Sequence, residues 1–184
     1  MEIIFVRHAE KGKLGEDSSL TNKGKKQAEY LTKGLSKFKK FDEFYCSDLD
    51  RAKQTAKIVS KKIKVRPKIE KSLNEFKSEI LKENKSSWDN KKKVHYKNLI
   101  LFLKRITKNP NDKKKILIIA HGITNRIILS FFLKLNMKRL IQFRTSETAI
   151  NSIYWADKFK NWRLKYWGND SYLPKKLRQS EGSY

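Results

Sequence analysis

Several residue types are scarce in this sequence, and each shortage narrows the kind of protein it can encode. Its 184 residues include one cysteine, three histidines, three prolines and seven glycines. A single cysteine, Cys46, excludes an internal disulfide framework and favours a reducing compartment, so we expect a cytoplasmic protein. Three histidines and one cysteine leave few ligands for a zinc site. The small number of glycines and prolines argues against long flexible linkers.

Long apolar runs are also missing. No stretch of about 18 or more apolar residues occurs, so we expect no membrane span and no membrane partner. The N-terminus has no basic segment followed by an apolar run, so we expect no secretory signal. The apolar residues, 38% of the chain, are clustered, and the length suits one domain with a core. We expect a single domain over residues 1–172 and a loosely ordered tail over residues 173–184.

Acidic residues are few: 19 aspartates and glutamates face 44 lysines and arginines, which gives a net charge of +25. Such a balance can indicate nucleic acids, anionic membranes or acidic substrates as partners. However, most of the basic residues are lysines spread along the whole chain, whereas specific phosphate recognition favours arginine. We therefore interpret the charge as a biased surface composition and keep nucleic-acid binding as a less favoured alternative.

Strand-like and helix-like patterns alternate along the chain. Apolar runs predict strands at 2–6, 41–46, 65–69 and 116–120, and a hairpin at 150–155 and 162–167. Helical patterns cover residues 21–35, 49–63, 91–106 and 123–135. The polar stretch 70–96 reads as a loop or short helices over the site. The alternation predicts a three-layer α/β sandwich, with a mainly parallel central sheet and helices on both faces.

Two of the predicted strands end in a histidine. Arg7 and His8 follow the first strand, and His121 and Gly122 follow the strand at 116–120. Arg51 comes shortly after another strand, where a helix opens. Because ligands bind at the carboxyl ends of parallel strands, we expect these side chains to converge on one anion. Two guanidiniums and two imidazoles suit a phosphoryl group, and a glycine opening a helix favours a close anion.

Five segments together resemble the histidine phosphatase superfamily, also called phosphoglycerate-mutase-like. The matching segments are Arg7–Glu10, Leu20–Ala28, Ser47–Ala56, Leu73–Glu75 and Ala120–Gly122. They follow the order and spacing of the family over about residues 1–155, which is most of the chain. The resemblance implies a phosphoglycerate-mutase-like fold.

The resemblance also implies roles for the residues at the strand ends. His8 would be the nucleophile that forms a phosphohistidine, with its other ring nitrogen oriented by a hydrogen bond. Arg7, Arg51 and His121 would hold the phosphoryl oxygens, with help from the backbone N–H of Gly122. Chemistry of this kind needs neither a metal nor another cofactor.

Glu75 would be the general acid that protonates the leaving oxygen and then the base that activates water. The chain departs from the family pattern nearby, because Glu79 stands where a glycine is frequent, so Glu79 is a rival acid. If that stretch is helical, the two carboxylates share a face. Leu14 stands where the family often has asparagine, and Ala9 stands where it often has glycine.

Four functions follow from these observations. We favour a metal-independent histidine acid phosphatase-type enzyme that hydrolyses phosphomonoesters. A protein phosphohistidine phosphatase is the second reading, favoured if Glu75 points away from the site. A phosphoglycerate-type mutase is less favoured, because mutases carry longer insertions. The non-enzymatic alternative is a catalytically weak basic binding module. The substrate is a phosphorylated small molecule or a phosphoprotein, the surplus lysine favours a polyanionic one, and the oligomeric state stays open.

Overall fold

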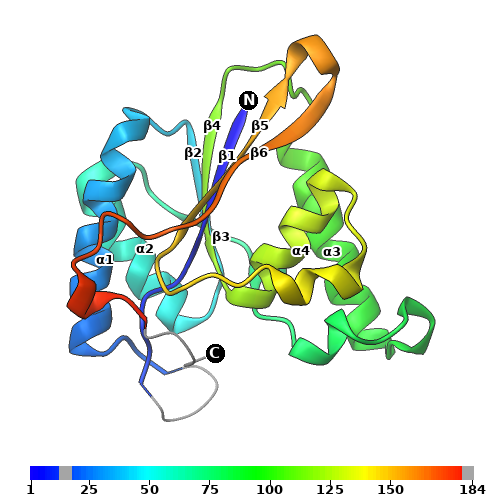
Figure 1. Ribbon diagram of the computed structural model, residues 1–184, viewed down its shortest axis with the longest axis horizontal. Helices are drawn as coiled ribbons and strands as arrows, with labels where there is room; N and C mark the ends of the chain where they lie inside the picture. The colour runs from blue at the N-terminus through cyan, green and yellow to red at the C-terminus, as the bar shows by residue number, and fades with distance from the viewer. Residues whose placement is uncertain (13–17, 180–184) are drawn as a thin grey trace.

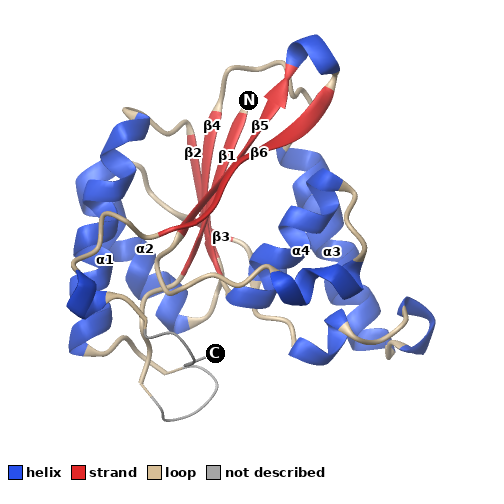
Figure 2. Ribbon diagram, viewed as in Figure 1, coloured by secondary structure: helices blue, strands red, loops and turns tan. Residues whose placement is uncertain are grey.

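The computed structural model describes residues 1–12 and 18–179, which form a six-stranded sheet between helices (Figures 1 and 2). The strands are β1 (Glu2–Arg7), β2 (Glu43–Cys46), β3 (Lys68–Ile69), β4 (Lys115–Ala120), β5 (Ile150–Ala156) and β6 (Asn161–Asn169). Their order is β3-β2-β4-β1-β5-β6. Strands β1 to β4 are parallel, β5 is antiparallel to β1, and β6 is antiparallel to β5. The predicted α/β sandwich with a mainly parallel sheet is confirmed.

Four α-helices in the described residues cover the two faces of the sheet. They are α1 (Asn22–Leu35), α2 (Asp50–Ile63), α3 (Asn90–Ile106) and α4 (Gly122–Leu133). Figure 2 shows α1 and α2 on one side and α3 and α4 on the other. Along β1, Ile4 and Val6 pack in the core that contains α1 and α2, whereas Ile3 and Phe5 pack in the opposite core. Burial on both faces explains why this strand is a continuous apolar run.

The start of α1 is fixed by Thr21 and Gly24. The Thr21 hydroxyl oxygen accepts a hydrogen bond from the backbone N–H of Gly24 at 2.9 Å, so the predicted cap is confirmed. The same hydroxyl donates to Glu10 Oε1 at 2.7 Å. A Cβ on Gly24 would lie 2.1 Å from the Glu10 carbonyl oxygen, so only glycine fits. This contact presses the segment after β1 against α1.

Two elements differ from the sequence prediction in extent. The strand expected at 65–69 is reduced to β3 at the sheet edge, since Pro67 has no N–H for a strand ladder. The polar stretch 70–96 holds 3-10 helices at Lys71–Leu73, Ser78–Leu81 and Lys85–Ser87 before α3 begins. Its prediction as short helices is confirmed.

The part of the predicted tail that the structure describes, residues 173–179, packs beside α1. Leu173 and Leu177 are buried, and residues Lys175–Leu177 form a 3-10 helix. The Gln27 side-chain amide on α1 donates to the Leu177 carbonyl at 2.8 Å. The tail packs because these leucines reach a covered position beside α1, although the sequence around them is polar. Residues 180–184 lie outside the described residues.

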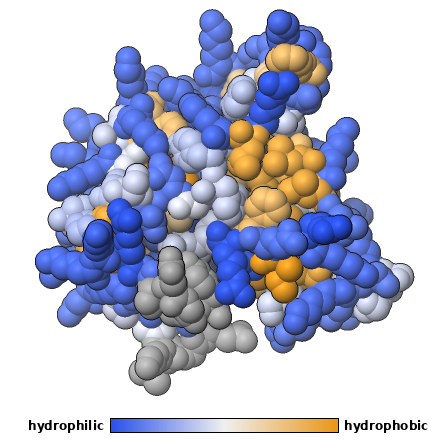
Figure 3. Space-filling model, viewed as in Figure 1, coloured by the Kyte–Doolittle hydropathy of each residue, from blue (hydrophilic) through white to orange (hydrophobic). Residues whose placement is uncertain are grey.

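The face of the molecule drawn in Figure 3 is mostly hydrophilic, as the charge leads one to expect. Figure 3 shows hydrophilic colour over most of this face and an apolar area right of centre, where Figure 1 draws α4 beside β6. The exposed large apolar side chains include Ile141, Phe159 and Leu164. Among the described helices, none combines the length and the apolar character needed to cross a membrane.

Candidate active site

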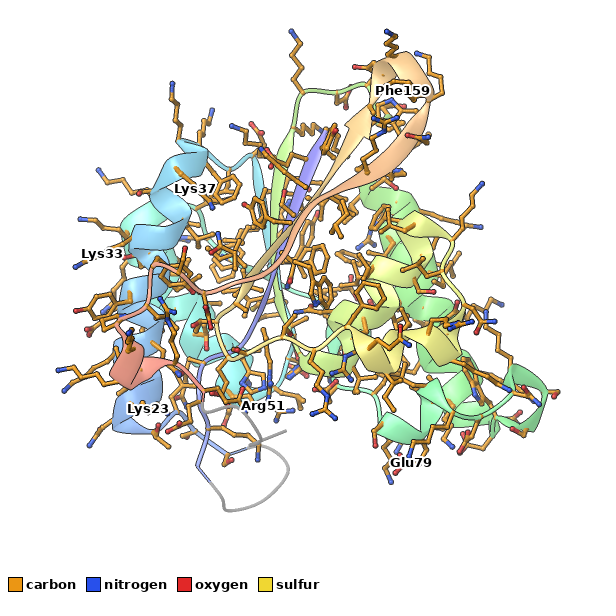
Figure 4. All side chains as sticks on the ribbon, in the orientation of Figure 1. Lys23, Lys33, Lys37, Arg51, Glu79 and Phe159 are labelled. Carbon is orange, nitrogen blue, oxygen red and sulfur yellow. The ribbon has the colours of Figure 1, made fainter. Side chains whose placement is uncertain are left out.

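Three neighbouring strands end at the same edge of the sheet and bring the predicted residues together. Arg7 in β1 pairs with Ala120 in β4, and the His8 N–H donates to the Ala120 carbonyl at 2.9 Å. The Ser47 N–H after β2 donates to the Ile119 carbonyl at 3.0 Å. The residues that follow β1, β2 and β4 are therefore neighbours. Figure 4 shows Arg51 at this end of the sheet.

Hydrogen bonds fix the ring of His8, which is buried. Its Nδ1 lies 2.7 Å from the Ala9 carbonyl oxygen, and a carbonyl only accepts, so Nδ1 carries the hydrogen. Nε2 therefore keeps its lone pair, which accepts a hydrogen bond from Arg51 Nε at 3.1 Å. Burial, followed by the charge of Arg7, lowers the pKa of His8 well below its usual value of 6.5. His8 is thus a neutral imidazole with a defined tautomer.

The guanidinium of Arg7 is held from one side. Its Nη1 donates to the Thr145 carbonyl at 2.9 Å and lies 3.5 Å from Gln179 Oε1 in the tail. Its Nη2 lies 3.9 Å from a carboxylate oxygen of Glu147. A Cβ on Gly122 would lie 3.8 Å from Arg7 Nε, so the start of α4 is directly beside this guanidinium.

His121 is fully buried, and its ring centroid lies 5.0 Å from that of His8. Its Nε2 lies 2.7 Å from the Ser47 hydroxyl oxygen. That hydroxyl donates its hydrogen to Asn74 Oδ1 at 2.8 Å, so it accepts the hydrogen on His121 Nε2. The second ring nitrogen, Nδ1, keeps its lone pair. Burial, then the charges of His8 and Arg51, lower the pKa of His121 well below 6.5.

Glu75 lies in the loop between the 3-10 helices Lys71–Leu73 and Ser78–Leu81, and its carboxyl group lies beside His121. Its Oε1 accepts hydrogen bonds from the backbone N–H groups of Ile123 at 3.0 Å and Thr124 at 3.3 Å, in the first turn of α4. Its Oε2 lies 3.9 Å from His121 Nδ1. Burial raises the pKa of Glu75 above its usual value, although the two N–H groups oppose this. The carboxyl can therefore hold a proton beside the two imidazoles.

Glu79, the rival acid, lies elsewhere. It is exposed in the 3-10 helix Ser78–Leu81, and Figure 4 shows it far from Arg51. That helix begins only after Glu75, so the two carboxylates do not share a helical face. Leu14, at the family's frequent asparagine position, lies outside the described residues.

Sequence reasoning missed several residues that the structure brings to the site. They are Ser47, Asn74, Thr124, Arg126, Thr145 and Glu147. Ser47 and Asn74 stand inside segments that match the family, so their position beside Arg51 and Glu75 was an available signal. Glu147 sits in a stretch with no pattern that marks it.

The described residues contain no group of three or more histidine, cysteine, aspartate or glutamate side chains placed to hold a metal ion. What they offer is two guanidiniums, two neutral imidazoles and a carboxyl with a raised pKa. Guanidiniums bind phosphoryl oxygens, an unprotonated ring nitrogen can attack phosphorus, and the carboxyl can supply a proton. The fold and these groups suit phosphoryl transfer.

The family model described as histidine phosphatase superfamily (branch 1) matches residues 3–99 and 95–170. The chain therefore belongs to the histidine phosphatase superfamily. The predicted family is confirmed, and membership supports the expected phosphatase activity. A comparison with curated protein sequences gives no match.

Solved structures with the same fold cover nearly the whole chain. Phosphoserine phosphatase from Entamoeba histolytica, in complex with 3-phosphoglyceric acid, is 19% identical over 94% of this chain and 99% of its own, with a TM-score of 0.74. A mycobacterial glucosyl-3-phosphoglycerate phosphatase is 16% identical over 94% and 99%, with a TM-score of 0.74. A putative alpha-ribazole-5'-P phosphatase from Escherichia coli is 20% identical over 92% and 97%, with a TM-score of 0.73. At these identities the likeness establishes the fold.

Proposed function

We propose that this protein hydrolyses phosphomonoesters through a phosphohistidine formed on His8. The observation that carries the proposal is the His8 ring, whose Nδ1–H is bound to the Ala9 carbonyl while its Nε2 lone pair faces Arg51. A nucleophilic imidazole needs this tautomer. Attack on phosphorus would use the lone pair that accepts a hydrogen bond from Arg51 Nε, so this hydrogen bond would break and Arg51 would turn to a phosphoryl oxygen.

The reaction has two steps, and Glu75 serves in both. In the first, His8 Nε2 forms a bond to phosphorus, the ester P–O bond breaks, and the leaving oxygen takes the proton of Glu75. In the second, water attacks phosphorus, Glu75 takes a proton from that water, and the P–N bond breaks to release phosphate. His8 is then neutral again. Arg7 and Arg51 would donate hydrogen bonds to the phosphoryl oxygens throughout. His121 would border the same space, and its Nδ1 would need a proton to donate to a phosphoryl oxygen as well.

Glu75 decides between the two kinds of phosphatase considered above. Its Oε2 lies 3.9 Å from His121, and its raised pKa suits proton donation. The leaving oxygen of a phosphate ester needs that proton, whereas the P–N bond of a phosphoramidate breaks with less help. The position of Glu75 therefore supports phosphate esters as substrates over protein phosphohistidine.

We further propose a small phosphorylated molecule as the substrate and the cytoplasm as the location. The solved relatives are named for phosphatases of phosphoserine, glucosyl-3-phosphoglycerate and alpha-ribazole-5'-P, which supports a small-molecule substrate. The single cysteine, Cys46, is buried, and its burial raises the pKa of the thiol to about 12. Such a thiol is inert, and a chain without disulfides suits a reducing compartment.

The test is hydrolysis of p-nitrophenyl phosphate by the wild type and by His8→Ala, each with EDTA present. We expect turnover by the wild type in EDTA and a loss of at least about 10³-fold in the variant, as for other removed nucleophiles. Salt-sensitive nucleic-acid binding without turnover of any phosphate ester would instead support the basic binding module. Turnover that survives in His8→Ala would exclude His8 as the nucleophile.

A further inference from the structure

Arg126 on α4 lies beside the groups proposed to do the chemistry. It comes four residues after Gly122, which adjoins Arg7, and three after Ile123, whose N–H binds Glu75. Residues three and four apart share a helix face, so Arg126 continues the face that borders the site. Its side chain is half-buried, and its Nε donates to the Phe143 carbonyl at 2.5 Å.

The segment 143–147 holds Arg126 and Arg7 together. The Phe143 carbonyl accepts from Arg126, and two residues later the Thr145 carbonyl accepts from Arg7 Nη1 at 2.9 Å. Glu147 in the same segment lies 3.9 Å from Arg7 Nη2. Both guanidiniums are therefore anchored along one short stretch of backbone, at the same end of the sheet.

The charge around Arg126 is unbalanced. In the described part of the chain, no carboxylate lies within ion-pair distance of it, and Glu147 lies beside Arg7 instead. Burial lowers the pKa of Arg126, and repulsion from Arg144 and Arg7 lowers it further, whereas Glu75 alone opposes this. Because Arg126 uses Nε for the Phe143 carbonyl, its two terminal nitrogens remain to bind an anion in a fork.

We infer that Arg126 binds a second anionic group of the substrate, a carboxylate carried on the leaving-group side of the phosphate ester. The inference rests on the proposed function. We place the carboxylate on the leaving-group side because Glu75, which would protonate the leaving oxygen, is bound by the helix turn just before Arg126. A planar carboxylate matches the two terminal nitrogens of a guanidinium. This narrows the anionic substrate expected from the charge to a phosphorylated carboxylic acid.

The experiment compares 3-phosphoglycerate with glycerol 3-phosphate, which share the phosphate ester and differ by a carboxylate in place of a hydroxymethyl group. We expect the wild type to prefer 3-phosphoglycerate by about 10- to 100-fold in kcat/KM, the range of a charge-assisted hydrogen-bonded pair. In Arg126→Gln that ratio falls to near one, because kcat/KM falls more for 3-phosphoglycerate than for glycerol 3-phosphate. Arg126→Lys keeps the charge without the fork and retains part of the preference.

Arg163→Gln is the matched control. It removes the same charge from β6, where the guanidinium stacks 3.7 Å from the Phe159 ring centroid, and Figure 4 shows Phe159 at the opposite end of the molecule from Arg51. The substrate ratio should be unchanged in this variant. Thermal melting checks that each variant is folded.

Three results would overturn the inference. One is a wild type without preference for the carboxylate. Another is an unchanged ratio in Arg126→Gln. The third is an equal loss on both substrates, which indicates damage to Arg7 through the segment 143–147. If the wild type hydrolyses neither these esters nor p-nitrophenyl phosphate, the proposed function fails, and this inference fails with it.

Discussion

Arg51 Nε donates a hydrogen bond to His8 Nε2 across 3.1 Å, from the first turn of α2 to the end of β1. The contact holds the lone pair of the ring in one direction, and the Ala9 carbonyl fixes the opposite nitrogen. Both side chains are buried, so neither partner is free to rotate into solvent. The attacking atom and the cation that would receive phosphoryl charge are thus neighbours, and the hydrogen bond between them would break when the lone pair attacks phosphorus.

Arg51→Lys tests this contact. Lysine keeps the charge but cannot present Nε and a terminal nitrogen in a fixed fork, so kcat for aryl phosphates should fall about 10²- to 10³-fold. Steady-state kinetics measure the loss. Arg66→Lys makes the same exchange at an exposed position and should behave as the wild type. Near wild-type kcat in Arg51→Lys would show that charge alone suffices.

Ser47→Ala tests the tautomer of His121. The Ser47 hydroxyl links Asn74 to His121 Nε2, and its loss leaves a buried ring N–H without an acceptor. Such a loss costs about 1–3 kcal/mol, so we expect roughly a 5- to 100-fold lower kcat/KM. In a His121→Ala background the Ser47 substitution should have no further effect, because Ser47 acts through the imidazole. Additive losses would mean that Ser47 acts independently.

The pH dependence of alkyl phosphate hydrolysis tests the two protonation states. The reaction needs neutral His8 and protonated Glu75. Because the pKa of His8 is lowered well below 6.5, the acidic limb of the rate profile should lie below that value. Because the pKa of Glu75 is raised above 4.5, activity should persist above that value and fall as Glu75 loses its proton. An alkaline limb that is unchanged in Glu75→Gln would assign the proton to another group.

Glu75→Gln should also lower the rate with alkyl phosphates by about 10²- to 10⁴-fold, the usual contribution of a general acid. In a single turnover the loss should be smaller with p-nitrophenyl phosphate, whose leaving group needs no proton. Glu79→Gln removes an exposed carboxylate and is the matched control, with no expected change. Equal effects of the two substitutions would contradict the choice of Glu75.

The residues of the site that could be predicted from sequence share one property. Arg7, His8 and His121 directly follow apolar strands, and Arg51 opens a helix shortly after a third, so local pattern placed them at one sheet edge. The link between Ser47 and His121 could not be predicted, because it depends on how β2 and β4 are aligned. That register is a long-range property, fixed by Phe44 pairing with Leu117 and its neighbours.

The choice between Glu75 and Glu79 was also beyond local pattern. It depends on where the helical turn that contains Glu79 begins, and the 3-10 helix at Ser78–Leu81 begins late enough to leave Glu75 outside it. The tail shows the same limit. Leu173 and Leu177 form no periodic pattern, yet both are buried because the segment passes over α1.

Gly24→Ala tests the contact that holds the segment after β1. The new Cβ would lie 2.1 Å from the Glu10 carbonyl oxygen, so backbone must move, at a cost of about 1–3 kcal/mol of unfolding free energy. Urea denaturation measures the change. Gly12→Ala is the control, since its Cβ would meet nothing closer than the Ser19 carbonyl oxygen at 3.8 Å. Equal stability of the two variants would mean that α1 shifts without cost.

The most direct test of the central claim is to trap the covalent intermediate. p-Nitrophenyl phosphate, whose leaving group needs no proton, is mixed with the wild type or Glu75→Gln. The reaction is quenched in alkali to preserve phosphohistidine, and intact protein and peptides are examined by mass spectrometry. We predict one phosphoryl group on His8, accumulating more in Glu75→Gln because the second step lacks its base, and none in His8→Ala. Substrate hydrolysis at full rate with no phosphorylated protein, or with the phosphoryl group on another residue, would contradict nucleophilic catalysis by His8.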